Sequence, residues 1–282
     1  MIKPSVAIVG TGRLASALAK QLVRCGYQIK EILAHRDVER GRRLARQVKA
    51  RASTFARARF DADLVWLCVP DAAIAECAAR VANANWRGRA AFHSSGVQTS
   101  DALRVLAGQG AALASVHPLM TFVKDASPDL TGVAFALEGN PRALKLAATI
   151  VRDLGGGVVR VRRGDKEAYH AFATMICPLL ISLMAAAEAA AEQAHFSRRQ
   201  ARRLAMPIIA QTLINYRSLG PARSFTGPIA RGDVETVRLH LAALAKAPAA
   251  EQAYVALARA ALVYLPAAHR EELRRLLTPG GA

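Results

Sequence analysis

Two short polar clusters could carry chemistry, and each directly follows an apolar run. His-Ser-Ser-Gly occupies positions 93–96, and Ser-Val-His-Pro occupies positions 115–118. A serine hydroxyl can donate a hydrogen bond to a carbonyl or carboxylate, and a histidine can exchange a proton near neutral pH. These chemistries make Ser94 and Ser95 candidates to bind a substrate and His117 a candidate acid or base. Turn formation by the serines and an ordinary loop histidine are the alternatives.

A third set of polar residues lies further along the chain, spaced so that its members would share one face of a helix. Lys166, His170 and Thr174 are four residues apart, and much of the surrounding segment is apolar. Burying such groups without partners costs roughly 1–3 kcal/mol each, so we expect them to face polar neighbours. Lys166 and His170 are further catalytic candidates, with His170 the alternative to His117, and Thr174 is a candidate for substrate binding. A solvated first helical turn would also explain Lys166.

A glycine-punctuated break, Thr-Gly-Pro-Ile-Ala-Arg-Gly-Asp at 226–233, separates two apolar helical segments. Arg231 in this break could bind a carboxylate or a phosphate, because its planar guanidinium pairs with either in a bidentate manner. Asp233 could hold Arg231 or cap the helix that follows. The four cysteines are far apart in the sequence and form no metal-binding pair. We therefore expect neither a metal site nor a disulfide framework.

The N-terminal segment contains a dinucleotide-binding pattern. An apolar run at 6–9 is followed by Gly-Thr-Gly-Arg-Leu-Ala at 10–15 and then by a helical pattern. The first glycine permits a tight turn, the second lets the backbone approach a pyrophosphate, and the small last residue lets the helix pack on the strand. A glycine turn in an unrelated α/β protein is the alternative. The predicted cofactor-binding residues here are Gly10, Thr11, Gly12, Arg13, Leu14 and Ala15, with Val69 and Pro70 at the end of a later strand.

Arg36 follows the second predicted strand, where the ribose of a dinucleotide would lie. An acidic residue there would bind the 2′-hydroxyl of NAD, whereas an arginine suits the 2′-phosphate of NADP. The neighbouring Asp37 leaves NAD open, and a surface arginine on an arginine-rich helix is a further alternative. Arg36 therefore favours NADP as the cofactor.

The elements that must position these residues form two domains. Apolar runs predict a series of strands at 6–9, 29–34, 53–56, 64–69, 90–93, 112–116, 133–137 and 158–161. From residue 164 the strand pattern ends, and alanine- and leucine-rich helical segments follow. The predicted fold class is α/β, with an N-terminal doubly wound Rossmann-type parallel sheet over 1–163 and an all-helical C-terminal domain over 164–282. We expect ligands to bind in a cleft between these domains.

Composition narrows the functional classes. The net charge of +18 comes from scattered basic residues without interleaved aromatics, which argues against nucleic-acid binding. The uncharged segment 171–187 is shorter than the ~20 residues of a membrane span, so we expect a buried central helix and no membrane anchor. No signal peptide precedes the first strand, which predicts a cytoplasmic protein. The abundant apolar helical surface predicts a homodimer through the C-terminal helices.

The ordered set of motifs resembles a known family. The glycine loop, Val-Pro-Asp at 69–71, the two histidine clusters, Tyr-His at 169–170 and the break at 226–233 are together similar to Rossmann-like proteins with a DUF2520 domain. These proteins belong to the 6-phosphogluconate dehydrogenase-like superfamily and are often labelled F420-dependent NADP oxidoreductase-like. The resemblance covers essentially the whole chain. It implies an NADP-binding domain and a helical, often dimerising domain, but no substrate.

Two related groups imply residue roles. The order of a serine at one strand end and His-Pro at the next is similar to the order in prephenate dehydrogenases. This resemblance implies a substrate-binding serine, Ser94 or Ser95, in the first cluster and a catalytic His117. Lys166 and His170 are similar to the Lys-x-x-x-Asn pair of β-hydroxyacid dehydrogenases. Pro178 stands where many family members have an asparagine, and this departure leaves open whether the protein binds the family's usual ligand and whether it has kept catalysis.

The sequence thus predicts an NADP-dependent oxidoreductase that moves a hydride between nicotinamide and a small, anionic substrate. Ser95 would orient the substrate, and His117 or His170 would act as acid or base. A histidine that titrates near pH 6.5 would give the pH profile a limb there. A catalytically silent NADP-binding sensor or partner-binding protein is the alternative from another class. A third interpretation keeps the enzyme and adds a deazaflavin as second cofactor.

Overall fold

The computed structural model describes residues 3–34, 37–123 and 128–278. Its contacts divide the chain into two compact units, one up to Thr174 and one from Met175. The division falls inside α6 (Lys166–Ile176), later than the boundary after residue 163 expected from the sequence. The reason is that the first turns of α6 are hydrogen-bonded to strands of the first unit.

The first unit is built on one eight-stranded sheet with the strand order β3-β2-β1-β4-β5-β6-β7-β8. Neighbouring strands are parallel except β6 and β7, which are antiparallel. This order, with the chain crossing to both sides of β1, confirms the doubly wound Rossmann-type sheet predicted from the sequence. The strands are β1 (Val6–Val9), β2 (Ile29–Leu33), β3 (Arg51–Ser53), β4 (Leu64–Leu67), β5 (Ala90–His93), β6 (Ala112–Pro118), β7 (Ala134–Gly139) and β8 (Gly157–Arg160).

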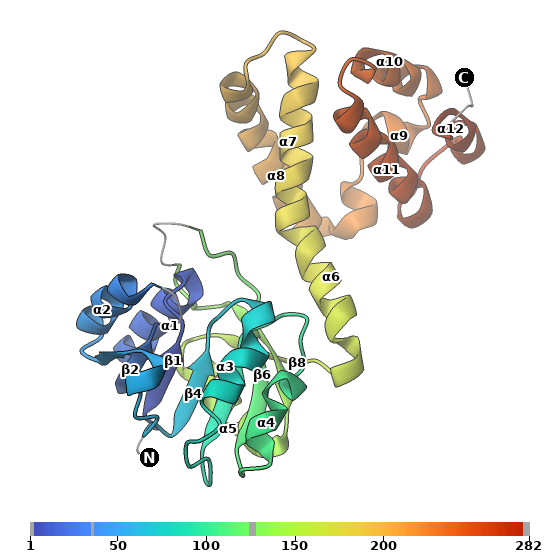
Figure 1. Ribbon diagram of the computed structural model, residues 1–282. Coiled ribbons are helices and arrows are strands. Elements are labelled where there is room, and N and C mark those ends of the chain that lie inside the picture. Colours follow the sequence, from blue (N-terminus) through green and yellow to red (C-terminus); the bar gives the residue numbers. More distant parts are fainter. Residues whose placement is uncertain (1–2, 35–36, 124–127, 279–282) are drawn as a thin grey trace. The chain divides into compact units, whose positions relative to one another are not determined.

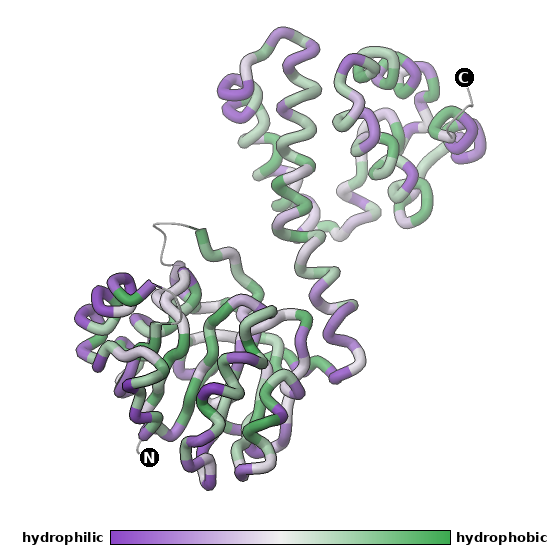
Figure 2. Tube along the Cα trace, in the orientation of Figure 1, coloured by the Kyte–Doolittle hydropathy of each residue, from purple (hydrophilic) through white to green (hydrophobic). Residues whose placement is uncertain are grey.

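Helices cover both faces of this sheet (Figure 1). Alternation along β1 places Val6 and Ile8 in a core with α1, α2 and α5, and Ala7 and Val9 in a second core with α3 and α4. Burial on both faces explains why the strands read as continuous apolar runs, and Figure 2 shows hydrophobic residues along them. The helices of this unit before α6 are α1 (Arg13–Arg24), α2 (Val38–Gln47), α3 (Ile74–Arg80), α4 (Arg104–Ala107) and α5 (Pro141–Asp153), with 3-10 turns η1 (Phe55–Arg57), η2 (Asp71–Ala73), η3 (Ser100–Leu103) and η4 (Arg163–Asp165).

Parallel pairing determines where the polar motifs lie. β1, β4, β5 and β6 run in the same direction, so their carboxyl ends meet at one edge of the sheet. The glycine loop follows β1, Val69 follows β4, and the clusters 93–96 and 115–118 lie at the ends of β5 and β6. One sheet edge therefore carries all of these motifs, and it is the edge at which open α/β sheets bind ligands.

The regular elements among the described residues of the second unit are all helices, as predicted. A small core gathers Val237, Leu262 and Leu273 from three of its helices. Local signals set the helix ends, since Ser197 forms a capping box at the start of α8 and Gly220, with φ 75°, interrupts the regular geometry of that helix. The helices are α7 (Pro178–Glu192), α8 (Arg198–Ser224), α9 (Pro228–Arg231), α10 (Val234–Leu244), α11 (Pro248–Tyr264) and α12 (Arg270–Leu276).

The segment 171–187 differs from the expected buried central helix. Cys177 separates α6 from α7, which begins at Pro178, because proline has no N–H with which to continue a helix. No residue of α7 is buried, and Ile181 is 62% exposed. The prediction of burial is wrong for the single chain, since composition identifies an apolar helix but not what covers it. By length and composition alone, the run Arg163–Glu192 is sufficient to cross a membrane.

Candidate functional site

The glycine loop between β1 and α1 contains two glycines with different roles. Gly10 has φ 116°, and a Cβ there would overlap the carbonyl oxygen of Cys68, just after β4. Gly12 has φ −68°, and a Cβ there would meet no atom within 4 Å. The fold itself therefore requires Gly10, whereas the open space at Gly12 suits a ligand that approaches the backbone.

The helix that follows the loop begins without a side-chain cap. Gly12 is the N-cap of α1, no side chain accepts a hydrogen bond from the first turn, and no acidic residue lies there. By contrast, Asp37 caps α2 and Asn140 caps α5. Backbone N–H groups at an uncapped N-terminus can bind anions, phosphates in particular. Ala15 is fully buried, which lets α1 pack closely on the sheet.

The other predicted cofactor residues border this loop. The guanidinium of Arg13 donates to the carbonyl oxygen of Phe122 at 3.3 Å. Cγ1 of Val69 lies 3.4 Å from the position that a Cβ of Gly10 would occupy, so Val69 is adjacent to the loop. The remaining predicted residues are Thr11 and Leu14, which are half-buried, and Pro70, which is exposed.

Two residues bear on the choice between NAD and NADP. Arg36 lies outside the described residues. Asp37 accepts a hydrogen bond from the backbone N–H of Arg40 at 2.9 Å and so caps α2. This contact engages Oδ1 of the carboxylate, the group type that would bind the ribose of NAD.

Both candidate serines are engaged within the fold. The indole N–H of Trp66 donates to the hydroxyl of Ser94 at 2.8 Å. Ser95 is buried, and its hydroxyl accepts from the backbone N–H of Gln98 at 2.9 Å, as serines do in turns. Substrate binding by either hydroxyl stays a prediction.

His93, which precedes the serines, is fully buried at the end of β5. Its Nδ1 accepts from the backbone N–H of Ser95 at 3.1 Å, and its Nε2 lies 2.9 Å from the carbonyl oxygen of Thr99. These contacts satisfy a neutral imidazole with its proton on Nε2. Burial lowers the pKa of His93 to about 4, so the ring is uncharged at neutral pH.

Lys166 is 1% exposed and joins α6 to the ends of β5 and β6. Its Nζ donates to the carbonyl oxygen of Ser95 at 3.0 Å and to the hydroxyl of Ser115 at 2.7 Å, and that hydroxyl donates to the same carbonyl at 3.0 Å. Burial lowers the pKa of Lys166 to about 8, and the negative charges of Glu138 and Asp71 oppose this shift. These contacts indicate that Lys166 holds the site together.

A buried carboxylate near this network was not identified from the sequence. In β7, Glu138 accepts from the hydroxyl of Ser100 at 2.9 Å and from the backbone N–H of the same residue at 2.5 Å. Arg163 lies 3.5 Å from Glu138 and also pairs with Asp101 at 2.7 Å. The sequence signal that could have identified Glu138 is its position directly after the apolar run at 133–137.

Two histidines and a tyrosine lie together at the end of β6. Nδ1 of His117 is 2.8 Å from the hydroxyl oxygen of Tyr169, and the two rings meet edge to face at 5.7 Å. The ring centroids of His117 and His170 are 6.1 Å apart. The structure thus brings both candidates for proton transfer together. Tyr169 contributed to the family resemblance, but its contact with His117 had no signal in the sequence.

His117 is uncharged at neutral pH. Burial, which is the largest cause, the positive charge of Lys166 and the interaction with His170 together lower its pKa to about 4. The expectation that His117 gives the pH profile of the reaction a limb near pH 6.5 is therefore wrong. A position at the end of a strand does not reveal how deeply the ring is buried. The neutral ring can still donate or accept hydrogen bonds.

Gly96 allows the two histidines to approach the end of β5. A Cβ at this position would overlap Cδ2 of His170 and would lie 3.1 Å from Nε2 of His117 and 3.1 Å from Nε2 of His170. A larger residue would displace a ring or α6. The Nε2 atoms of both rings therefore lie close to the same backbone position.

Thr174 and Arg231 are the remaining predicted substrate-binding residues. Thr174 ends the first unit, is half-buried, and makes no side-chain hydrogen bond within the described residues. Arg231 is an exposed residue of α9 in the second unit. Asp233 caps α10 by accepting from the backbone N–H of Thr236 at 3.1 Å, which is one of its two expected roles. Substrate binding by Thr174 and Arg231 stays a prediction.

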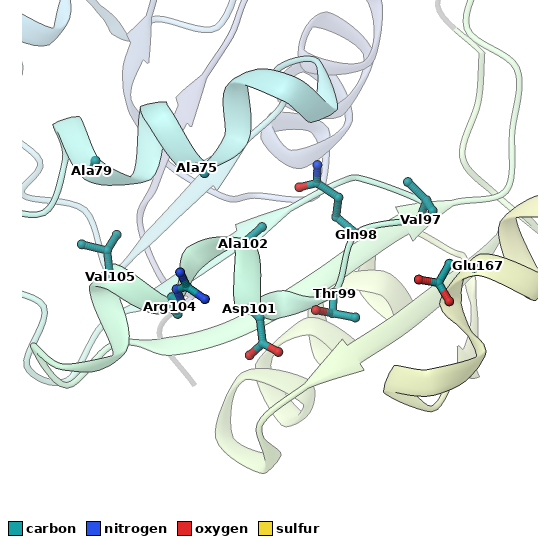
Figure 3. Close-up of a pocket in the computed structure, with 10 residues that line it drawn as sticks. All are labelled: Ala75, Ala79, Val97, Gln98, Thr99, Asp101, Ala102, Arg104, Val105 and Glu167. Atoms are coloured by element: carbon teal, nitrogen blue, oxygen red, sulfur yellow. The ribbon is translucent and has the colours of Figure 1, made fainter.

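A hollow of about 560 Å³ is lined by residues of α3, α6 and the segment 97–105 (Figure 3). Its polar lining includes Gln98, Asp101 and Glu167, and it contains neither histidine of the pair. Among the described residues, no group of three or more histidine, cysteine or acidic side chains could hold a metal ion, and the four cysteines are free thiols. The glycine loop and the histidine pair therefore remain the chemical features of this sheet edge.

Two protein-family models match the chain. Residues 2–118 match the Rossmann-like domain, and residues 133–261 match the domain of unknown function DUF2520. The chain is a Rossmann-like protein with a DUF2520 domain. The family resemblance of the sequence motifs is confirmed. In this Rossmann-like DUF2520 protein the second match begins just before β7, so it extends across the division between the two compact units.

Solved structures share the fold of this DUF2520 protein. A Bacteroides fragilis protein provisionally named an NADP oxidoreductase is 24% identical, with a TM-score of 0.78 over 92% of this chain and 97% of that chain. An imine reductase from Pseudomonas sp. is 20% identical, with a TM-score of 0.63 over 93% and 94% of the two chains. A reductive aminase from Aspergillus terreus, solved with NADPH4, cyclohexanone and allyl amine, is 17% identical, with a TM-score of 0.66 over 93% and 94%. A comparison with curated proteins gives no match.

Proposed function

We propose that this protein is an NADP-dependent oxidoreductase that moves a hydride between the nicotinamide and a carbon atom of a small substrate. One observation carries the proposal. An open glycine loop and an uncapped helix N-terminus share a sheet edge with the pair formed by His117 and His170. The activities named for the imine reductase and the reductive aminase, which have the same fold, support this chemistry.

The residues of the loop fit a dinucleotide. The backbone at Gly12 is open to a pyrophosphate, and the first turn of α1 offers N–H groups that no side chain caps. Val69 and Pro70 would border the nicotinamide half of the cofactor. When bound, the nicotinamide would supply or accept the hydride, while the chain provides position and hydrogen bonds.

The histidine pair would act on the oxygen or nitrogen atom that is bonded to the reacting carbon. Nε2 of His117 has no protein hydrogen bond among the described residues and lies close to Gly96. Reduction of a C=O or C=N bond places a hydride on carbon and a proton on the heteroatom, so a donor at the heteroatom assists it. The positive charge of Lys166 nearby and the net charge of +18 favour an anionic substrate.

We infer NADP rather than NAD from Arg36 and from the use of Asp37 as a helix cap. Titration should show tighter binding of NADPH than of NADH. Arg36→Ala should remove most of that difference, because the 2′-phosphate would lose its guanidinium partner. Equal affinities in the wild type would contradict the choice of NADP.

A pair of glycine variants tests the proposal. Gly12→Ala and Gly108→Ala both add a Cβ where no atom lies within 4 Å and φ is ordinary, so both should keep the wild-type Tm. Only Gly12→Ala should weaken NADPH binding, measured by fluorescence titration, because its methyl group would occupy the space of the pyrophosphate. Absence of NADPH binding in the wild type, or equal binding by both variants, would refute the proposal.

We also propose a homodimer that forms through the C-terminal helices. α7 and α8 expose large apolar side chains, among them Ile181, Ile208 and Tyr216. A hollow of about 620 Å³ with an almost wholly apolar lining lies between these two helices. Apolar surface of this extent favours burial against another chain, and a two-fold dimer covers the same surface on both copies.

A further inference from the structure

Tyr169 makes one hydrogen bond, and it connects α6 to the histidine at the end of β6. Its hydroxyl oxygen lies 2.8 Å from Nδ1 of His117, which is its only hydrogen-bond partner within the described part of the chain. A phenol O–H is more acidic than an imidazole N–H, and an imidazole nitrogen is more basic than a phenol oxygen. The favourable arrangement therefore has Tyr169 donating and Nδ1 accepting. Burial raises the pKa of Tyr169 to about 12, so the hydroxyl keeps its proton.

Acceptance at Nδ1 determines the state of the other ring nitrogen. A neutral imidazole carries one proton, so an accepting Nδ1 leaves that proton on Nε2. Nε2 of His117 has no hydrogen-bond partner among the described residues, and none of their buried side-chain nitrogen or oxygen atoms lacks a partner. Nε2 must therefore reach solvent. It presents an N–H group beside Gly96.

We propose that Tyr169 is a positioning residue whose hydroxyl fixes the Nε2–H tautomer of His117, so that Nε2–H donates a hydrogen bond to the substrate's reacting oxygen or nitrogen. This inference rests on the proposed hydride transfer and specifies its substrate class as a carbonyl compound or an imine. The hydride that reduces the carbon comes from the cofactor, and the proton that the heteroatom takes up comes from solvent. His117 keeps its proton throughout, and Tyr169 keeps its hydrogen bond.

The charges that surround the ring favour the same state. Lys166 and His170 both disfavour a second proton on His117, and burial has the same effect. The opposite tautomer, with Nδ1 protonated, would turn a bare nitrogen toward the substrate. Such a nitrogen suits a hydroxyl or amine that donates a hydrogen bond, but it repels a carbonyl oxygen. The direction of the hydrogen bond from Tyr169 thus separates two substrate classes.

The second unit contains a matched pair that serves as an internal control. Nδ1 of His240 lies 3.0 Å from the hydroxyl oxygen of Tyr254, and their rings also meet edge to face, at 5.8 Å. Tyr254→Phe removes the same kind of contact as Tyr169→Phe. It does so at a position that has no part in the proposed reaction.

Nitrogen-15 spectroscopy of the histidine rings in the full chain tests the tautomer without any substrate. Long-range proton–nitrogen correlation reports which ring nitrogen carries the proton, and His117→Asn assigns the signals of His117. The wild type should show Nε2 protonated and Nδ1 bare. Tyr169→Phe should give a mixture of tautomers, whereas Tyr254→Phe should change the signals of His240 alone. A protonated Nδ1 in the wild type, or an unchanged spectrum in Tyr169→Phe, would overturn the inference.

Turnover of a panel of ketones, aldehydes and imines with NADPH tests the consequence for the reaction. Tyr169→Phe should lower kcat about tenfold to hundredfold, comparable to the loss when the partner that orients a metal-bound histidine is removed, and should leave the KM for NADPH unchanged. Tyr254→Phe should keep the wild-type kcat. Turnover by Tyr169→Phe at the wild-type rate would refute the positioning role of Tyr169. No turnover of any carbonyl compound or imine by the wild type would refute the substrate class. Failure to bind NADPH would instead refute the proposed function, and the tautomer spectrum would still decide the hydrogen bond.

Discussion

Nζ of Lys166 lies 2.7 Å from the hydroxyl oxygen of Ser115, although the two residues are 51 positions apart in the sequence. The contact ties the start of α6 to the strand that carries His117. Tyr169 and His170 follow within the next turn of the helix, so their position relative to that strand depends on this anchor. We therefore expect changes at Lys166 to affect the whole site through its geometry.

Lys166→Met should lower the free energy of unfolding by about 1–3 kcal/mol, because it removes the donor to Ser115 and to the carbonyl of Ser95. Denaturant unfolding measures this change. Lys145→Met, at an exposed position of α5, is the matched control and should leave stability within about 0.5 kcal/mol of the wild type. A loss no larger in Lys166→Met than in the control would show that the anchor does not form.

Lys166 also makes the free energy of unfolding depend on pH in the alkaline range. Its pKa is about 8 in the folded chain and near 10.5 in the unfolded chain, so between these values the unfolded chain binds more protons. Wild-type stability should therefore rise between pH 8 and pH 10.5 through this group, as the cost of burying its charge disappears. Lys166→Met should lack this contribution, whereas Lys145→Met should retain it.

Acid should destabilise the fold through His93. Its pKa is about 4 in the folded chain and near 6.5 in the unfolded chain, so stability is full above pH 6.5 and is lost as the pH falls toward 4. The contribution is on the order of 3 kcal/mol. His93→Asn should flatten this part of the unfolding profile, whereas His269→Asn, at an exposed site, should not. Parallel profiles in the wild type and His93→Asn would contradict the buried neutral ring.

His117→Asn should keep NADPH affinity and lower turnover of a reducible substrate by about 10²–10³, the usual effect of losing a hydrogen-bond donor at the reacting group. Because the pKa of His117 is about 4, any limb of the pH profile between pH 5 and pH 8 should survive in this variant. His170→Ala is the comparison, since assignment of proton transfer to His170 predicts that this variant removes the limb. Retained turnover in both variants would overturn the assignment of the histidines, whereas a wild type that turns over no reducible substrate would favour a silent NADP-binding protein.

Ile181→Glu should convert the proposed dimer to a monomer, because it places a charge in the apolar surface of α7. Light scattering over a wide concentration range gives the mass. Val159→Glu is the control, since it adds the same charge at another exposed apolar position, in β8 of the first unit. A monomeric wild type at all concentrations would exclude the dimer, and cosedimentation with lipid vesicles would indicate that a membrane covers α7 instead.

Local patterns predicted the parts of the structure that depend on neighbouring residues. The apolar run at 6–9 followed by Gly10 and Gly12 predicted the first strand, the turn and the helix, because strand, turn and helix are adjacent in the chain. Asp233 was a correct candidate for a helix cap for the same reason. The order of motifs also placed the histidine clusters at strand ends, and parallel pairing brings those ends to one edge.

Contacts between distant residues could not be read from the same patterns. Lys166 is buried because its partners Ser95 and Ser115 lie 71 and 51 positions away, and no spacing rule connects them. The contact between Tyr169 and His117 is of the same kind. Burial also determines the pKa of His117, so its departure from pH 6.5 followed only from the fold.

The hydrogen bonds of Lys166 and Tyr169 are made to residues of the fold itself, Ser95, Ser115 and His117. The conformational entropy of this part of α6 is therefore lost during folding and not during binding. A substrate that meets such a preorganised site does not have to order the helix first. Differences in affinity among substrates should then report their own contacts with the histidines, and calorimetry should show little variation in the entropy of binding across a series of similar size.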